Sequence, residues 1–184
     1  MRYCIVDLEC VCWTKEDPNK AEHEIIELGA VLLDENFNYI KEFDYFVRPK
    51  NNYILSEFCK NLTSIKQEDV SSALAFPVVM LFLADWLEDF SDVTLASWGN
   101  FDKDQLQKDC KAWWIKYPFT KDHINVKELF SKKLNRKRCG LGKACRILNI
   151  QFEGVHHRGI DDAKMIAKIF RMLNTENYKK FIKE

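Results

Sequence analysis

Apolar residues gather in three successive segments at the start of the chain, and polar or turn-forming residues separate them. The first segment is a short apolar run, the second is apolar almost throughout, and the third alternates apolar and polar positions. Such patterns predict β-strands, and Asp34-Glu35-Asn36 is a turn signal between the second and the third. Three successive strands connected in this way predict an antiparallel meander. The predicted strands cover residues 2–9, 24–33 and 38–47.

The pattern becomes helical after Pro49, because Leu55, Phe58, Cys59 and Leu62 recur at helical spacing. A later run, residues 93–98, is short and uncharged, which is typical of a strand inside a parallel sheet. Strands first and then alternating helices and strands predict an α/β fold, a mixed sheet flanked by helices. We predict helices at 55–62, 66–70, 77–90, 102–114, from 127, 140–148, 161–173 and 176–183, a loop at 132–138, and a second central strand at 123–126.

Composition indicates one folded domain over residues 1–184. Hydrophobic residues make up 47% and aromatic residues 13%, which excludes a disordered chain. The seven cysteines are scattered with no C-x-x-C pair, so we predict free thiols, with Cys10 and Cys12 buried or half-buried, rather than disulfides or a zinc site. Acidic residues interrupt the first apolar run, and no run is long enough to span a membrane. We therefore expect a cytoplasmic protein of a reducing compartment.

Charge is distributed unevenly although the formal net charge is zero. Residues 1–90 carry 8 Lys and Arg against 17 Asp and Glu, whereas residues 91–184 carry 20 against 11. An acidic half and a basic half are compatible with an acidic metal centre beside a rim that binds phosphates.

Two carboxylates, Asp7 and Glu9, stand at the end of the first predicted strand. Residues i and i+2 of a strand project from the same face, so both side chains are expected to point into one small volume. Like charges this close raise each other's pKa unless a cation lies between them. A hard divalent cation such as Mg²⁺ prefers such oxygen ligands. The alternative is an exposed strand end with two solvated acids.

Two later motifs place further acids beside predicted helices. Asp102 stands where residues 93–98 turn into a helix, and the carboxyl ends of strands are where ligand sites form in open α/β sheets. Asp162 follows His157 by five residues and opens another helix, so both are expected to face one site. The alternative for Asp102 is a helix cap, and for the second motif a surface loop with capping acids.

Together these motifs closely resemble the 3′–5′ exonucleases of the DEDDh type, which have a ribonuclease H-like fold. Within that type they are most similar to the branch that holds the histone-mRNA 3′ exonuclease and the sporulation-kinase-pathway inhibitor. The narrower match lies in Leu55-Ser56-x-Phe58-Cys59-x-x-Leu62-Thr63 and in residues 157–164, His-Arg-Gly-Ile-Asp-Asp-Ala-Lys. The resemblance covers residues 2–173. It implies Asp7, Glu9, Asp102 and Asp162 as ligands of two Mg²⁺ or Mn²⁺ ions, with Glu9 and His157 as catalytic residues and His157 as general base.

One departure concerns substrate contacts. Relatives commonly have Ala-Thr after the D-x-E triplet, where they meet the terminal nucleotide, whereas this chain has Cys10-Val11. Val11 lacks the hydroxyl group, which puts that sugar contact in doubt. Phe101 and Trp13 are the aromatic residues nearest the motifs and are candidates for base stacking, with core packing as the alternative. The basic residues between Lys132 and Arg138 are candidates for RNA backbone contacts, with a solvated loop as the alternative.

The resemblance implies a metal-dependent 3′–5′ exoribonuclease that acts on single-stranded 3′ ends and releases nucleoside 5′-monophosphates. One alternative is a 3′–5′ DNA exonuclease with the same chemistry. A second is a non-catalytic regulatory module that binds protein or nucleic acid. The presence of all five motif residues counts against this second alternative.

Overall fold

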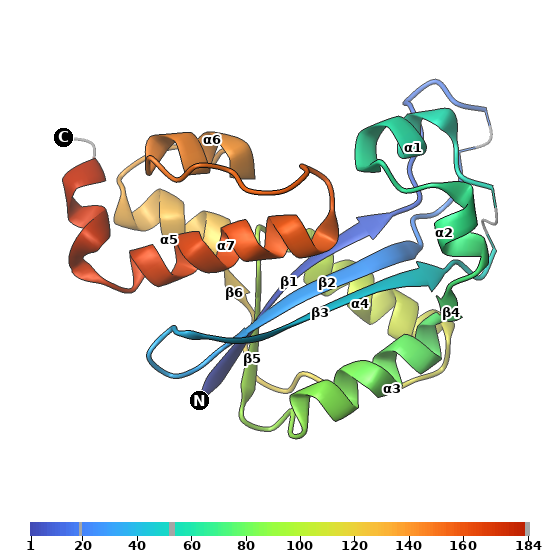
Figure 1. Ribbon diagram of the computed structural model, residues 1–184, viewed down its shortest axis with the longest axis horizontal. Coiled ribbons are helices and arrows are strands. Elements are labelled where there is room, and N and C mark those ends of the chain that lie inside the picture. The colour runs from blue at the N-terminus through green and yellow to red at the C-terminus, as the bar shows by residue number, and fades with distance from the viewer. Residues whose placement is uncertain (19, 52–53, 183–184) are drawn as a thin grey trace.

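A mixed six-stranded sheet forms the centre of the computed structural model, which describes residues 1–18, 20–51 and 54–182 (Figure 1). β2 pairs antiparallel with both β1 and β3, while β5 lies parallel to β1 on its other side and β4 lies parallel to β3. The predicted α/β class and the antiparallel meander are therefore confirmed. The strands are β1 (Arg2–Cys10), β2 (Ile25–Leu33), β3 (Tyr39–Arg48), β4 (Leu74–Ala75), β5 (Val93–Ser97) and β6 (Ile124–Asn125), in spatial order β4-β3-β2-β1-β5-β6.

Helices cover both faces of this sheet, so β1 and β2 are apolar on both faces (Figure 1). One core lies between the sheet and α5, α6 and α7, and a second lies between the sheet and α3 and α4. The helices are α1 (Glu57–Thr63), α2 (Gln67–Ser71), α3 (Phe76–Leu87), α4 (Phe101–Ala112), α5 (Val126–Lys133), α6 (Leu141–Ile147), α7 (Gly159–Leu173) and the 3₁₀ helix η1 (Glu176–Phe181).

Several elements differ from their prediction. The strand expected as central at 123–126 is the two-residue β6 at the sheet edge, because it pairs on one side only, with β5. The helix expected from residue 161 begins at Gly159, which places Asp161 and Asp162 in its first turn. The helix expected at 176–183 is η1, and residue 183 lies outside the described residues. The loop expected at 132–138 loses its first two residues to α5.

Two glycines bring the start of α7 directly against the sheet. A Cβ atom on Gly29 of β2 would lie 2.1 Å from the carbonyl carbon of Gly159, and one on Gly159 would lie 3.0 Å from the Asp7 carbonyl oxygen. Side chains at either position would push the helix off the strands. The loop before α7 is thus held at the end of β1.

The seven cysteines are free, with Cys10 buried and Cys12 half-buried as predicted. Among the described residues, no helix combines the length and the apolar character needed to cross a membrane.

Candidate active site

Asp7 and Glu9 lie near the carboxyl end of β1, where Asp7 is half-buried and Glu9 is 8% exposed. Burial raises the pKa of Glu9 to about 8, and the charges of Asp162, Glu27 and Asp102 add to that increase. Burial also raises the pKa of Asp7 well above its ordinary value, with further increases from Asp102, Asp162 and Glu9. The acids therefore share one small volume, as the strand period predicts, and they are not a solvated strand end.

Asp102 lies in the first turn of α4, next to β1. The Leu8 N–H donates a hydrogen bond to Asp102 Oδ1 at 3.1 Å, so the carboxylate is fixed between the two acids of β1. Burial raises its pKa to about 6, while hydrogen bonds from Leu8 and Ser97 and the charge of Lys127 oppose that increase. Its side chain bonds to β1, and the residue at the helix cap is Asn100, so the capping alternative is wrong for Asp102.

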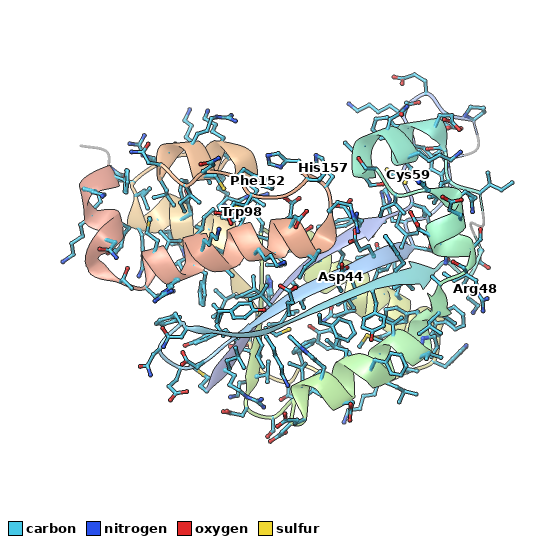
Figure 2. All side chains as sticks on the ribbon, in the orientation of Figure 1. Asp44, Arg48, Cys59, Trp98, Phe152 and His157 are labelled. Carbon is cyan, nitrogen blue, oxygen red and sulfur yellow. The ribbon has the colours of Figure 1, made fainter. Side chains whose placement is uncertain are left out.

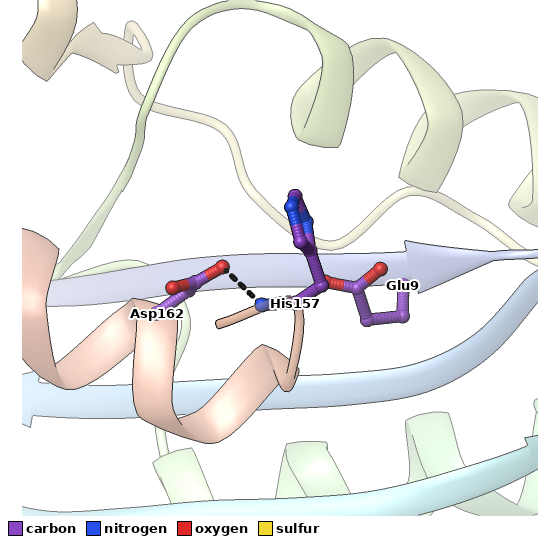
Figure 3. A group of neighbouring side chains, drawn as sticks. All are labelled: Glu9, His157 and Asp162. Carbon is purple, nitrogen blue, oxygen red and sulfur yellow. Dashed lines mark hydrogen bonds between the residues drawn. The ribbon is translucent and has the colours of Figure 1, made fainter. Parts of the chain in front are cut away.

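Asp162 lies in the first turn of α7 and His157 in the loop just before it, and Figure 3 shows both side chains beside Glu9. The backbone N–H of His157 donates to Asp162 Oδ2 at 3.1 Å. One potential metal-ligating atom from each of Glu9, His157 and Asp162 lies within 4.8 Å of the other two. The His157 ring is exposed, and Figure 2 shows it on the loop that leads into α7, on the side that faces α1. The structure thus brings together all five predicted residues.

The neighbouring pair, His156 and Asp161, behaves differently. Asp161 accepts a hydrogen bond from the Val155 N–H at 2.8 Å, so it ties the preceding loop to the first turn of α7 and does not cap the helix. His156 stacks on Phe152 with ring centroids 3.6 Å apart, and its Nδ1 lies 3.6 Å from Asp162 Oδ1. Sequence spacing does not reveal this proximity, because it depends on how the loop folds back onto α7.

One carboxylate oxygen of this site has the His156 ring 3.6 Å away but accepts no hydrogen bond from the described residues. Asp162 Oδ1 is buried, and no hydrogen-bond donor reaches it from the residues that the structure describes. A buried carboxylate oxygen without a donor is costly, and a cation can compensate for it. Four carboxylates and one imidazole suit a divalent ion of the Mg²⁺ or Mn²⁺ kind, so the residues fit the metal that the fold implies.

The expected substrate contacts of Cys10 and Val11 stay a prediction for their backbone, since the side chains of both residues are buried. Their side chains are only 6% and 2% exposed, and Val11 packs with Ile26 and Leu55 in a separate core cluster. The Val11 N–H donates to the Glu24 carbonyl, and its own carbonyl lies 2.7 Å from His23 Nδ1. Neither side chain is available to a ligand.

Phe101 remains available, since it is 50% exposed beside Asp102. Its ring lies 5.8 Å from that of His23, which in turn lies 6.1 Å from that of Trp13. His23 therefore joins the two predicted aromatic residues into one ledge. Nothing in the sequence pattern around His23 signals this neighbourhood, so the ledge is visible only in the structure.

The basic run after Lys132 is largely used within the protein. Lys132 and Arg138 pair with Glu128, at 2.9 and 3.4 Å. Lys133 donates to the Leu173 carbonyl and Arg136 to that of Phe181, so both hold the C-terminal segment in place. Lys127, which precedes this run, lies near the acids instead, and its charge lowers the pKa of Asp102.

Comparison with known proteins gives matches over most of the chain. The family model described as "Exonuclease" (RNase_T) matches residues 4–170. The chain is 37% identical to 3′-5′ exoribonuclease 1 of Rattus norvegicus and 35% identical to that of Homo sapiens, in each case over 183 residues, 92% of this chain and 52% of the relative. The chain therefore spans about half the length of these relatives.

Solved structures agree. The nuclease domain of 3′hExo, described as a DEDDh family member bound to rAMP, is 33% identical, with a TM-score of 0.84 over 94% of this chain and 91% of that one. A structure of exonuclease I from E. coli shares the fold at 11% identity, with a TM-score of 0.74 over 98% of this chain and 42% of that one. The family match and the acids gathered at the end of β1 lead to one conclusion: the chain belongs to the exonuclease family, in its DEDDh branch.

Proposed function

We propose that this chain is a metal-dependent 3′–5′ exoribonuclease that hydrolyses single-stranded 3′ ends to nucleoside 5′-monophosphates, with residues 1–184 forming its nuclease domain. The observation that carries the proposal is the convergence of Asp7, Glu9, Asp102 and Asp162 with His157 around one volume. The relatives named as exoribonucleases support the choice of RNA.

The four carboxylates would hold the divalent ions, for which we propose Mg²⁺ or Mn²⁺, two per site. When bound, such ions supply an activated water molecule and neutralise charge on the phosphate. Metal binding requires ionised carboxylates. The raised pKa values of Glu9 and Asp102 indicate that, without metal, these carboxylates bind protons more readily than exposed ones do.

His157 would take the proton from the attacking water. Its ring is exposed, while its backbone N–H is fixed on Asp162, so the imidazole has room to meet a substrate at a defined position. Imidazole accepts protons near neutral pH, and a general base typically contributes about 10²–10⁴-fold to the rate.

The terminal base would stack on Phe101, with His23 and Trp13 continuing the ledge. An unpaired base offers its face to aromatic side chains irrespective of sequence, and the stacking contributes about 1–3 kcal/mol per base. This arrangement suits a single-stranded end and gives little sequence preference.

The test uses RNA and DNA oligonucleotides of the same sequence, labelled at the 5′ end, with and without Mg²⁺ or Mn²⁺. We expect RNA to shorten from the 3′ end in single-nucleotide steps, only in the presence of metal. Asp7→Asn is the matched control and should leave the RNA intact. If DNA shortens faster than RNA, DNA replaces RNA as the proposed substrate. If neither shortens, the nuclease proposal is overturned.

A further inference from the structure

Glu27 is a fully buried acid beside the site that the proposed chemistry does not use. It lies on β2 directly opposite Glu9 of β1, and its exposed fraction is 0%. A buried carboxylate is costly unless it is paired and hydrogen-bonded, so its partners indicate its role.

Four hydrogen bonds to the Glu27 carboxylate come from the two residues that follow His157. Arg158 Nε donates to both carboxylate oxygens, at 3.1 and 3.2 Å, and an Arg158 Nη donates to Oε1 at 3.0 Å. The backbone N–H of Gly159 donates to Oε2 at 3.0 Å. Forked guanidinium–carboxylate pairs fix orientation as well as distance.

Further contacts restrict the same loop. The Arg158 guanidinium lies over the ring of Phe46 on β3, 5.1 Å from its centroid. Gly159 packs against the backbone of Asp7 and Gly29, as described above. His157, one residue before Arg158, has a left-handed backbone with φ of 62°, a conformation that non-glycine residues adopt at a cost. Contacts to β2 and β3 therefore hold a strained residue whose ring faces the site.

Arg158 also compensates a charge. Glu27 contributes to the raised pKa values of Asp7 and Glu9, and it faces Asp44 of β3, whose pKa is raised to about 6 by burial and by Glu27. Without the guanidinium, Glu27 would be a fifth carboxylate next to the four acids of the site, with no cation to compensate its charge.

We propose that Glu27 and Arg158 are positioning residues, which together hold the His157 loop and the first turn of α7, and hence Asp162, against the end of β1. This inference rests on the proposed nuclease function. An ordinary structural ion pair would change stability alone, whereas a positioning pair changes the catalytic step in protein that remains folded.

The test compares Arg158→Lys, Arg158→Gln, Glu27→Gln and the double variant Glu27→Gln/Arg158→Gln in RNA cleavage, below the melting temperature of each. We expect kcat to fall about 10–100-fold, the usual effect of removing a group that orients metal ligands, with KM within about threefold. Arg158→Lys keeps the charge but loses the fork, so its loss should be smaller. The double variant should be no slower than the slower single variant, because the two residues act as one unit.

Lys164→Gln is the matched control, since it breaks a different ion pair, the 2.8 Å contact that joins α7 to Glu42 of β3. Its kcat should equal that of the wild type. A second measurement follows hydrogen exchange of the His157 amide, which is bonded to Asp162 and should exchange faster in Arg158→Gln and Arg158→Lys.

The positioning role would be overturned if the Arg158 variants had the kcat and the amide exchange rate of the wild type. It would also be overturned if the loss of kcat in the double variant equalled the product of the two single losses. If the wild-type protein cleaves no nucleic acid, the nuclease proposal fails, and the exchange measurement still decides whether the pair holds the loop. A variant that does not fold is replaced by Arg158→Lys, whose charge is unchanged.

Discussion

Each acid of the site is placed where the protein without metal is destabilised by its charge. Asp7 is the clearest case, since burial and four neighbouring carboxylates all raise its pKa. Glu9 and Asp162 share this environment. Residues kept at such a cost are typical of functional sites, where activity and stability oppose each other.

Asp7→Asn should therefore abolish cleavage and at the same time stabilise the metal-free protein. The amide keeps the shape of the side chain but removes repulsion with Asp102, Asp162 and Glu9. We expect a melting temperature about 2–4 °C higher, the shift that corresponds to about 1 kcal/mol in a chain of this size. Thermal unfolding in EDTA measures it, and a lower melting temperature would contradict this account of the site.

His157→Ala should reduce kcat by about 10²–10⁴-fold, because it removes the proposed general base. KM for the oligonucleotide should change little, since the four carboxylates are untouched. Single-turnover cleavage of RNA measures the effect. The matched control is Lys168→Ala, which removes a side chain of α7 that pairs with Glu153 at 2.6 Å, and a loss as large as that of His157→Ala would remove the special role of His157.

At the scale of elements, the decisive contact is that between α7 and the strands. α7 brings Asp162 and the loop that carries His157, β1 brings Asp7 and Glu9, and α4 brings Asp102. The helix reaches β1 only because Gly29 and Gly159 lie back to back.

Gly29→Ala should thus disturb stability and activity together. Its Cβ would meet the Gly159 backbone at 2.1 Å, so α7 must shift. We expect a loss of about 1–3 kcal/mol in the free energy of unfolding, the usual effect of overpacking, measured by urea titration. Cleavage should fall by about 10²-fold if the shift reaches about 1 Å.

Gly140→Ala is the control for this experiment, because a Cβ atom at this position would have nothing within 4 Å and the φ of −67° suits alanine. It should match the wild type in both measurements. Equal behaviour of the two alanine variants would show that the glycine contact does not set the position of α7.

At the scale of the molecule, the raised pKa values link folding to pH and to metal. An acid whose pKa is raised on folding stabilises the protein below its unfolded pKa, and that stability is lost as pH rises through the folded pKa. For this site the window runs from about pH 4 through about 6 for Asp102 to about 8 for Glu9.

The melting temperature of the metal-free protein should consequently fall between about pH 5 and about pH 8.5. Mg²⁺ should raise the melting temperature more at about pH 8 than at about pH 5, because only ionised carboxylates hold the ion. Differential scanning calorimetry with EDTA or Mg²⁺ measures both trends. Glu9→Gln should flatten the pH dependence and weaken the Mg²⁺ effect, and an unchanged Mg²⁺ effect in that variant would contradict the metal site.

The fold was largely predictable, because strand and helix periods in the sequence are local properties of the chain. The meander, the central strand β5 and the start of α4 near Asp102 follow from such patterns. The errors concern pairing: β6 is predicted at the centre and lies at the edge, and β4 is only two residues long and has no detectable period. Strand order depends on contacts between distant segments, which a local pattern does not contain.

The five motif residues were predicted from the resemblance to DEDDh exonucleases, and the local pattern places each of them at a strand end, at a helix start or in the loop just before one. What the sequence alone determined was therefore the identity of the acids, His157 and the elements that carry them. Only the tertiary structure decided that Val11 is buried, that His156 and His23 lie beside the site, and that Glu27 pairs with Arg158. These are contacts between residues distant in the chain or folded back by a loop, and packing in three dimensions sets them.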